Sequence, residues 1–244
     1  MSKKVNISII LPVYNEGENI TRQILVLEKK IEGLFEILVI YDFNEDNTIP
    51  YVKKLQQKYK QLHLLKNNFG RGVIPAVRTG IDESLGDAIV IMPADLADDP
   101  NTVNKMYDKI LQGFDIVSAT RYAKGGEKIG GGVIKTVLSR FAGLSTPIIL
   151  GIPITDISNG FKMYRRKVLD EIKIESTGGW EYSCELVIKA HKLGFKIGEI
   201  PTVWKDRTSG KSKFKLLKWL PKYLRWYLYG VFLRFRYPPA GRLV

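Results

Sequence analysis

Short apolar runs alternate with amphipathic segments along this chain, and the alternation restricts its possible folds more than any other sequence feature. Residues 7–13, 36–41 and 88–92 are rich in β-branched side chains, and residues 62–66 and 115–120 resemble further strands. Uninterrupted apolar strands are typical of parallel sheets that helices cover on both faces. The order of elements therefore predicts an α/β fold with a mostly parallel sheet.

The segments between these runs carry apolar residues at helical spacing. Ile20, Ile24 and Leu27 mark a first helix, and further helices are predicted over residues 73–85, 102–111 and 183–192. Helices that alternate with strands in this way connect neighbouring parallel strands. We therefore expect helices on both faces of the sheet.

The 244 residues suffice for one sizeable α/β domain, because single hydrophobic cores grow up to roughly 250 residues. We predict this domain over residues 1–210 and a helical appendage over residues 211–244. The single cysteine, Cys184, excludes an intramolecular disulfide framework and a multi-cysteine zinc site. This cysteine usage fits a reducing, cytosolic compartment.

Positive charge is concentrated at the carboxyl-terminal end. Residues 205–244 hold 11 basic side chains against one acidic, whereas residues 1–204 hold 27 basic and 24 acidic. Basic residues recur there every three or four positions, with apolar and aromatic residues between them, which predicts an amphipathic helix at an anionic membrane surface. The competing interpretation is a helix that docks on its own domain with its lysines in water. The basic stripe is Lys211, Lys215, Lys218, Lys222 and Arg225, and the aromatic rings are Trp219, Trp226, Tyr227 and Tyr229.

No charge-free stretch reaches the roughly 20 apolar residues that span a bilayer, the longest being residues 141–155. We therefore expect a peripheral attachment to the cytoplasmic face of a membrane. A membrane-bound partner protein is left open by the sequence. Nucleic acid is not expected as a partner, because the charge belongs to the tail.

Acidic residues follow three of the predicted strands, where open parallel sheets bind their ligands. Glu16 follows the first strand, Asp42 the second, and Asp95 the strand over residues 88–92. Carboxylates gathered at one edge repel one another unless a cation or a hydrogen-bond network holds them. A divalent ion with a phosphate-bearing ligand would satisfy such a cluster.

Each acidic residue also has a structural interpretation. Asp98 and Asp99 precede Pro100 and could only cap the start of a helix. Asp42 could belong to a solvated turn, although its position directly after a buried strand favours a nucleotide base or ribose. A dinucleotide site is disfavoured, because the first strand lacks the glycine spacing that a pyrophosphate needs.

Seven motifs in order resemble those of family 2 inverting glycosyltransferases of the dolichol-phosphate or polyprenyl-phosphate mannosyltransferase type. The resemblance covers residues 7–213, and the order of the motifs makes it specific. The motifs are Pro12-Val13-Tyr14-Asn15-Glu16, Tyr41-Asp42, Asn68-Phe69-Gly70-Arg71-Gly72, Ala94-Asp95-Leu96, Thr120-Arg121-Tyr122, Asp156-Ile157-Ser158-Asn159-Gly160-Phe161-Lys162 and Asp206-Arg207 with Gly210-Lys211-Ser212-Lys213.

The resemblance implies a GT-A (Rossmann-like) fold, a nucleotide-diphosphate sugar as donor and a polyprenyl phosphate as acceptor of one sugar of the mannose or glucose type. By position it implies that Pro12, Tyr14, Glu16 and Asp42 bind the nucleotide. It also implies that Asp95 contributes to a metal and diphosphate site.

The sequence departs from the family pattern at this metal site. The family usually has Asp-Ala-Asp-x-Gln, but Pro93 and Ala97 replace the first Asp and the Gln. Binding of Mg²⁺ or Mn²⁺ by Asp95 would therefore need Asp98 or Asp99 as a substitute ligand.

The chemistry of a phosphate acceptor needs cations rather than a base. A phosphate monoester is already anionic near neutral pH and can attack the anomeric carbon directly. Metal and basic side chains would neutralise the leaving diphosphate and position the incoming phosphate. Arg121 follows a strand, and Arg207, Lys211 and Lys213 lie in a loop that could close over the phosphate or be a solvated basic loop. Asp156 could organise the acceptor pocket or form an Asx turn.

Two other functions compete with this one. A transferase to a sugar or glycolipid hydroxyl would need a base, for which Glu185 on a predicted helix is the candidate. A catalytically weakened protein that only binds a nucleotide or an anionic lipid would explain Pro93 and Ala97.

Overall fold

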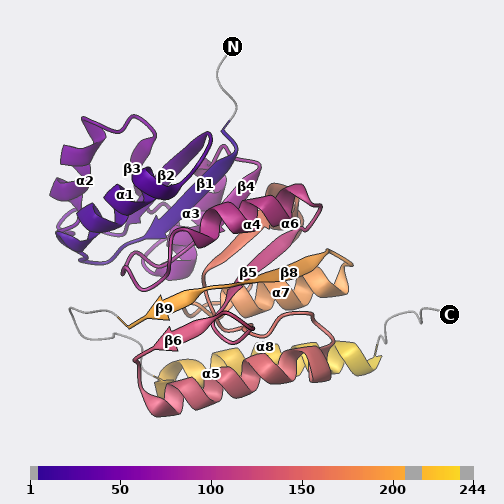
Figure 1. Cartoon of the computed structure of the whole chain (residues 1–244). Helices are drawn as coiled ribbons and strands as arrows, with labels where there is room; N and C mark the ends of the chain where they lie inside the picture. Colours follow the sequence, from indigo (N-terminus) through magenta and orange to yellow (C-terminus); the bar gives the residue numbers. More distant parts are fainter. Residues whose placement is uncertain (1–4, 207–215, 237–244) are drawn as a thin grey trace.

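A seven-stranded sheet in the order β3-β2-β1-β4-β7-β5-β8 forms the centre of the molecule (Figure 1). The structure is a computed structural model that describes residues 5–206 and 216–236. All neighbouring strands are parallel except β7, which is antiparallel to both β4 and β5. The strands are β1 (Ile7–Pro12), β2 (Phe35–Tyr41), β3 (Leu62–Lys66), β4 (Ala88–Ile91), β5 (Ile116–Thr120), β7 (Lys162–Arg165) and β8 (Ile197–Pro201). The predicted mostly parallel α/β sheet is confirmed.

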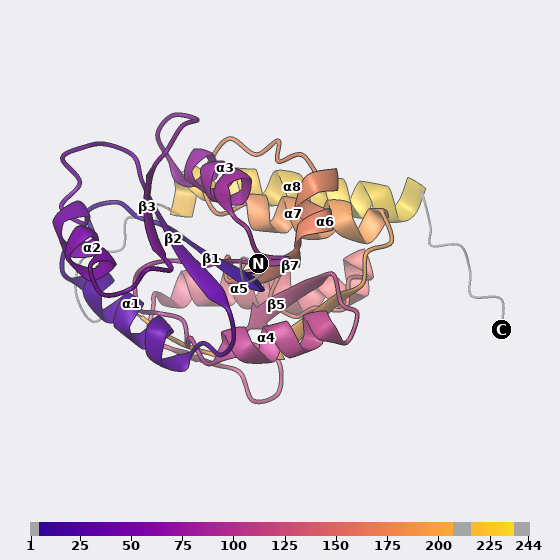
Figure 2. The same ribbon diagram turned by 90° about the horizontal axis from the view of Figure 1, so that it is seen from above.

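Helices cover both faces of the sheet, and each face has its own hydrophobic core (Figure 2). Helices α3, α6 and α7 pack on one face, and α1, α2 and α4 pack on the other. In β1, Ile9 and Leu11 point to one core and Ile10 to the other, as the alternation of side chains along a strand requires. The helices are α1 (Asn19–Lys30), α2 (Ile49–Gln56), α3 (Val73–Glu83), α4 (Thr102–Leu111), α6 (Arg166–Glu171) and α7 (Tyr182–Lys192).

The five strands expected from sequence are present, but the strand that separates β4 from β5 was not anticipated. β7 is only four residues long and carries charged residues at both ends, Lys162 and Arg165, so it lacks an apolar run. The glycine-dense segment over residues 125–132 contains the short strand β6 (Glu127–Ile129), which the sequence did not predict either.

A second, two-stranded sheet lies next to the segment that follows β4. β6 pairs in parallel with β9 (Val203–Lys205). The Lys205 amide donates to the Ala97 carbonyl at 2.9 Å, and Asp98 forms an isolated bridge with Trp204. The Asp95–Asp99 segment therefore lies against the residues that lead toward α8.

Helices α5 (Val133–Ser145) and α8 (Leu216–Arg236) run along the lower edge of the molecule in Figure 1, and a short π-helical turn, η1 (Thr146–Leu150), extends α5. The hydroxyls of Ser145 on α5 and Tyr227 on α8 are hydrogen-bonded at 2.6 Å. α5 approaches the 155–160 loop closely: a Cβ at Gly143 would lie 2.1 Å from the Thr155 carbonyl oxygen.

One side of α8 packs against the domain, as the docking interpretation of the tail expects. Trp226 and Leu233 are buried in the core that contains α7, and the Trp226 indole donates to the Ser176 hydroxyl at 2.7 Å. The described helix begins at Leu216, so the part of the predicted basic stripe before it lies outside the described residues.

Within the described residues, the stretch Val133–Leu150 is long and apolar enough, by length and composition alone, to cross a membrane, and 17% of it is buried. The sequence expectation missed it because it considered only charge-free runs, and Lys135 and Arg140 interrupt this one.

Candidate active site

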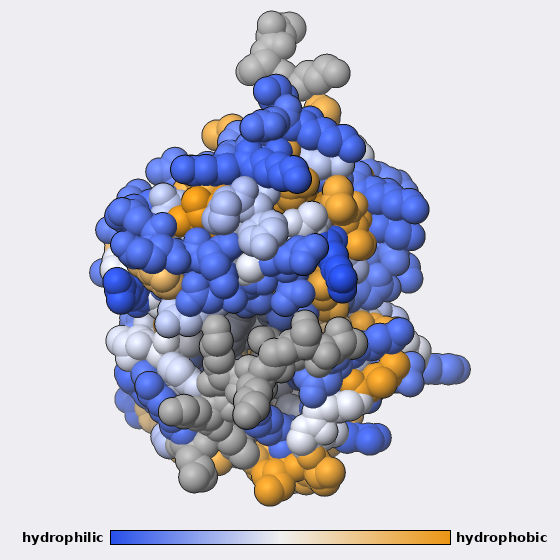
Figure 3. Space-filling model, turned by 90° about the vertical axis from the view of Figure 1, so that its left-hand side faces the viewer, coloured by the Kyte–Doolittle hydropathy of each residue, from blue (hydrophilic) through white to orange (hydrophobic). Residues whose placement is uncertain are grey.

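A cavity of about 910 Å³ lies at the carboxyl ends of β1, β2, β4 and β5 and extends to α5 and α8. Figure 3 views the molecule from the side of these strand ends, with hydrophilic surface above and hydrophobic surface along the lower edge, where α5 lies in Figure 1. Because parallel strands end at one edge, residues distant in sequence meet here. The predicted site residues that line the cavity are Pro12, Tyr14, Glu16, Asp42, Asp95 and Arg121.

Asp42 is held in place by the loop that follows β3. Its Oδ1 accepts a hydrogen bond from Asn67 Nδ2 at 2.7 Å, and its Oδ2 accepts one from the Gly72 amide at 2.9 Å. Gly72 has a φ of 123°, which favours glycine at this position. The carboxylate is therefore fixed at the cavity wall and is not part of a freely solvated turn.

Aromatic side chains surround the same end of the cavity. Tyr14 is 51% exposed and packs edge-on against Phe43, with 5.5 Å between ring centroids. Phe43 also contacts Arg71, whose guanidinium lies over the Phe43 ring at 5.4 Å from the centroid. An exposed ring next to a fixed carboxylate can bind a flat, hydrogen-bonding ligand such as a nucleotide base.

The acidic segment after β4 places its three carboxylates differently. Asp95 lines the cavity, and its Oδ1 accepts the Ala97 amide at 3.2 Å. Asp98 is 4% exposed, and neither carboxylate oxygen has a hydrogen-bond partner within the described chain. Burial, together with the nearby charge of Asp95, raises the pKa of Asp98 to about 7. Asp99 takes the helix-start role, because its Oδ1 accepts the Asn101 amide at 3.0 Å.

Arg121 and Asp156 form a two-point ion pair at the cavity floor. Arg121 Nε donates to Asp156 Oδ2 at 2.6 Å and a terminal nitrogen donates to Oδ1 at 2.9 Å. Burial opposes the charge on Arg121, but Asp156 outweighs this effect and raises the pKa of the guanidinium above its ordinary value. Arg121 lines the cavity, whereas Asp156 is wholly buried behind it. Asp156 therefore orients Arg121 and is not placed to contact a ligand itself.

The other end of the cavity is lined by Lys128 and Lys135, which sequence reasoning missed, and by Lys218, which it assigned to the basic stripe of the tail. Lys128 Nζ donates to the Thr136 hydroxyl at 2.6 Å and lies 5.4 Å from the Trp204 ring centroid. Burial, followed by the charge of Arg121, lowers the pKa of Lys128. The sequence signal that could have revealed Lys128 and Lys135 is the run of three glycines at residues 130–132, which these two lysines flank just before and within α5. Arg207, Lys211 and Lys213 lie outside the described residues.

Glu185 is a structural residue. Its carboxylate is fully buried on α7, accepts the Glu175 and Ser176 amides at 2.6 and 2.8 Å, and pairs with Lys189 at 2.6 Å. It does not line the cavity. The interpretation of Glu185 as a base was wrong, because a helical position could not reveal which way the side chain points.

A mostly parallel sheet between two helical layers, with its cavity at the strand ends, is the architecture of the GT-A class of glycosyltransferases. The chain belongs to glycosyl transferase family 2, whose sequence profile matches residues 8–173, more than half of its length.

Two named proteins are similar to this chain in sequence. The dolichol-phosphate mannosyltransferase of Pyrococcus furiosus is 30% identical over 214 residues, which are 86% of this chain and 60% of that protein. The polyprenol monophosphomannose synthase of Mycolicibacterium smegmatis is 27% identical over 227 residues, which are 86% of this chain and 85% of that protein. The chain thus spans 60% of the length of the Pyrococcus relative.

Solved structures of glucosyl-3-phosphoglycerate synthase from Mycobacterium tuberculosis share the fold. The complex with Mn²⁺, uridine diphosphate and glucosyl-3-phosphoglycerate has a TM-score of 0.69 at 19% identity, covering 97% of this chain and 82% of that one. The complex with Mg²⁺ and uridine diphosphate has a TM-score of 0.67 at 18% identity, with the same coverage. At this identity the similarity concerns the fold alone.

Proposed function

We propose that this protein transfers one hexose of the mannose or glucose type from a nucleotide-diphosphate sugar to a polyprenyl phosphate, with inversion. The observation that carries the proposal is one cavity that the carboxylates Glu16, Asp42 and Asp95 line at the strand termini. Lysines, together with Asp206, line it near α5 and α8, two helices that expose apolar residues. The names of the two relatives, which concern dolichol phosphate and polyprenol monophosphomannose, support the same acceptor class.

The acidic end of the cavity is assigned to the donor nucleotide. Pro12 and Tyr14 offer apolar surface to the base, and Asp42 offers a fixed carboxylate that accepts hydrogen bonds from a base N–H or a ribose hydroxyl. Glu16 lies on the same wall. Asp95, which follows β4 and lines the same cavity, is assigned to the diphosphate.

Asp95 and Asp98 are the residues that would hold a divalent ion. The described residues contain no group of three or more His, Cys, Asp or Glu side chains that could bind a metal by themselves. Mg²⁺, however, commonly binds one or two carboxylates and completes its shell with substrate phosphates and water. The unpartnered Asp98 carboxylate beside Asp95 fits such a site, whereas the Asp99 carboxylate is engaged at the start of α4. When bound, the ion would neutralise charge on the leaving diphosphate.

The cationic end is assigned to the acceptor phosphate. Arg121, Lys128 and Lys135 line it and would hold the phosphate monoester. The prediction that Arg207, Lys211 and Lys213 also bind this phosphate rests on the sequence, because they lie outside the described residues. Fixed cations position this anion for attack opposite the diphosphate, and they stabilise negative charge as the bond to the donor breaks. No base is required, because the nucleophile is already ionised.

Purified protein incubated with a short-chain polyprenyl phosphate and a panel of nucleotide sugars, with Mg²⁺ or Mn²⁺, is expected to form a glycolipid with at least one donor. Mass spectrometry of the lipid product measures the transfer. A free sugar alcohol offered in place of the phosphate is the matched control and is expected to give no product. Tight nucleotide binding without transfer to any phosphate acceptor would contradict the proposal and favour a binding protein.

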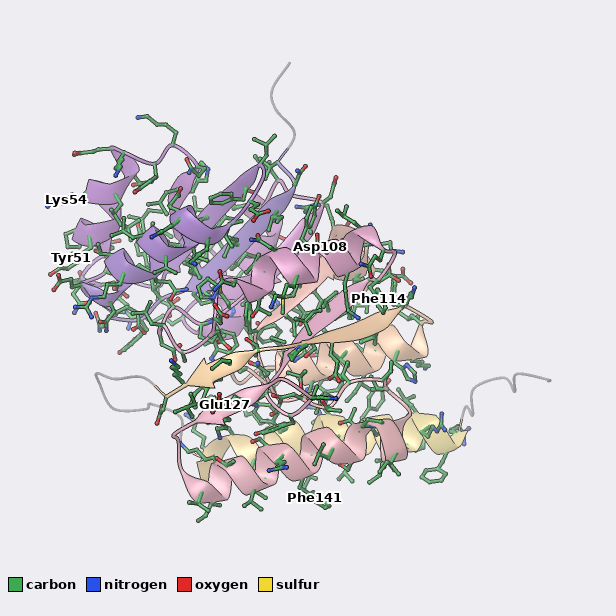
Figure 4. The ribbon with its side chains drawn as sticks, viewed as in Figure 1. Tyr51, Lys54, Asp108, Phe114, Glu127 and Phe141 are labelled. Atoms are coloured by element: carbon green, nitrogen blue, oxygen red, sulfur yellow. The ribbon has the colours of Figure 1, made fainter. Side chains whose placement is uncertain are left out.

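The enzyme is proposed to work at the cytoplasmic face of a membrane, held by the apolar sides of α5, η1 and α8. On α5, Phe141 is 72% exposed and points away from the molecule (Figure 4). Other apolar residues exposed on these helices are Val133, Ile134, Val137, Ile148, Leu224, Leu228, Phe232 and Phe235. Basic residues such as Arg140 and Arg225 accompany them, a combination typical of helices that lie in the plane of an anionic membrane.

Phe141→Asp is expected to weaken binding to anionic vesicles about tenfold or more, because burying one such side chain in an apolar phase contributes about 1.5–3 kcal/mol. Sedimentation with phosphatidylcholine vesicles, with and without phosphatidylglycerol, measures the binding. Leu25→Asp, which changes an exposed leucine on α1, is the control and should bind like the unmodified protein. Equal binding of both variants would refute a contact through α5.

A further inference from the structure

Lys162 is a buried lysine to which no function has been assigned above. It begins β7, opposite Ile91 of β4 and Ser118 of β5, and it is wholly buried in the middle of the sheet. Burying an ammonium group is costly unless hydrogen bonds or charges compensate it. The position therefore requires an explanation from its surroundings.

The Lys162 ammonium holds the backbone of the loop that precedes it. Its Nζ donates to the Ile157 carbonyl oxygen at 3.1 Å and also to the Asn159 carbonyl oxygen. From the α7 side, the Cys184 thiol donates to the same Ile157 carbonyl at 3.3 Å. The loop over residues 155–160 is thus wrapped around a cation, which fixes its path.

This loop is the part of the cavity floor that orients Arg121. It carries Asp156, which binds Arg121 at two points, and Ser158, whose hydroxyl accepts from Arg121 at 3.2 Å. Ser158 and Asn159 also line the cavity. The positions of all these groups depend on the backbone that Lys162 holds.

Several ionisable side chains are buried beneath the cavity. Two acids, Asp98 and Asp156, and two bases, Arg121 and Lys162, are buried close enough to influence one another. Burial lowers the pKa of Lys162 to about 8, while Asp156 and Asp98 favour its charged form and Arg121 opposes it. Removal of the Lys162 charge would leave the acids in excess and the two loop carbonyls without their donor.

We propose that Lys162 is a positioning residue that aims Arg121 into the cavity by clamping the 155–160 loop around its ammonium group. The inference concerns the geometry of the site whose function is proposed above, and it holds whichever sugar and acceptor the enzyme uses. Its test therefore reads out the Arg121–Asp156 pair directly and does not need turnover.

The side-chain Nε–H signal of Arg121 in a ¹⁵N-labelled protein reports this pair. Arg121→Lys identifies the signal by its absence. In Lys162→Met the signal is expected to shift and to exchange with water about tenfold faster or more, because the hydrogen bond to Asp156 opens more often. In the transfer assay the same variant should lower kcat and leave the KM for the nucleotide sugar within about twofold, since the Tyr14 and Asp42 end is untouched.

Arg166→Met is the matched control. Arg166 also clamps backbone carbonyls, those of Ser84 and Gly86, but at the opposite end of the sheet. It should lose stability without changing the Arg121 signal. Lys162→Gln, which keeps N–H donors without the charge, should give an intermediate exchange rate. An unchanged Arg121 signal in Lys162→Met would overturn the proposal. So would unfolding of both Lys162 variants while Arg166→Met folds, because Lys162 would then serve folding alone.

Discussion

Asp156→Asn is expected to lower the rate of transfer by about 10²-fold or more, because a small misplacement of a positioning group costs that much. The Asp156 carboxylate is fully buried and holds Arg121 by two hydrogen bonds of 2.6 and 2.9 Å. An amide can accept at only one of these positions, so the guanidinium loses its fixed direction toward the cavity. The loss should appear in kcat for glycolipid formation at saturating nucleotide sugar.

The same substitution should reduce the free energy of unfolding by about 3–5 kcal/mol, the usual effect of removing one partner from a buried ion pair. Asp115→Asn separates the two effects. Asp115 pairs with Lys167 at 2.8 Å and accepts the Lys196 amide at 2.9 Å, remote from the cavity-lining residues. It should destabilise the protein with little change in kcat. If Asp156→Asn transferred sugar as fast as the Asp115 variant, Arg121 would have no catalytic role.

Asp95→Ala is expected to lower transfer by about 10²–10³-fold, as removal of one group that stabilises developing charge commonly does. Asp95 lines the cavity at the end of β4, and Pro93 and Ala97 on either side of it cannot replace a lost carboxylate. The variant should also bind nucleoside diphosphate no more tightly with Mn²⁺ than without it. Calorimetric titration of the nucleotide, with and without the ion, measures this difference.

Asp99→Ala is the control for Asp95→Ala, because the Asp99 carboxylate hydrogen-bonds Asn101 at the start of α4. Loss of this exposed hydrogen bond costs about 1 kcal/mol of stability or less and should leave the nucleotide titration unchanged. Asp98→Asn should remove the metal effect as Asp95→Ala does, if the two carboxylates share the ion. Normal turnover by Asp95→Ala would contradict the assigned site.

The donor end of the site could be located from the sequence because it depends on strand ends. Asp42 directly follows an apolar strand, Glu16 and Asp95 come a few residues after the ends of theirs, and parallel strands must bring their ends to one edge. Local pattern and sheet geometry together therefore placed these residues in one cavity. Their roles in binding stay predictions.

The choice between neighbouring acids could not be made from the sequence. Asp98 and Asp99 have the same local pattern, yet Asp98 is buried near Asp95 and Asp99 accepts the Asn101 amide just before α4. Glu185 shows the same difficulty, since its fully hydrogen-bonded position depends on the path of residues 174–176 against α7. The direction of a side chain within a turn or helix is decided by packing against distant segments, which the neighbouring residues in the sequence do not reveal.

The sequence by itself determined the alternation of strands and helices from β1 to β5, the mostly parallel character of the sheet and the edge at which the acidic residues gather, because each of these follows from local periodicity and from the geometry of parallel strands. Only the tertiary structure decided that the antiparallel β7 enters between β4 and β5, that Lys128 and Lys135 line the cavity, and that α5 lies against α8 while both helices expose apolar residues. These features arise from contacts between segments far apart in the chain, and such contacts are selected by packing and charge balance in three dimensions.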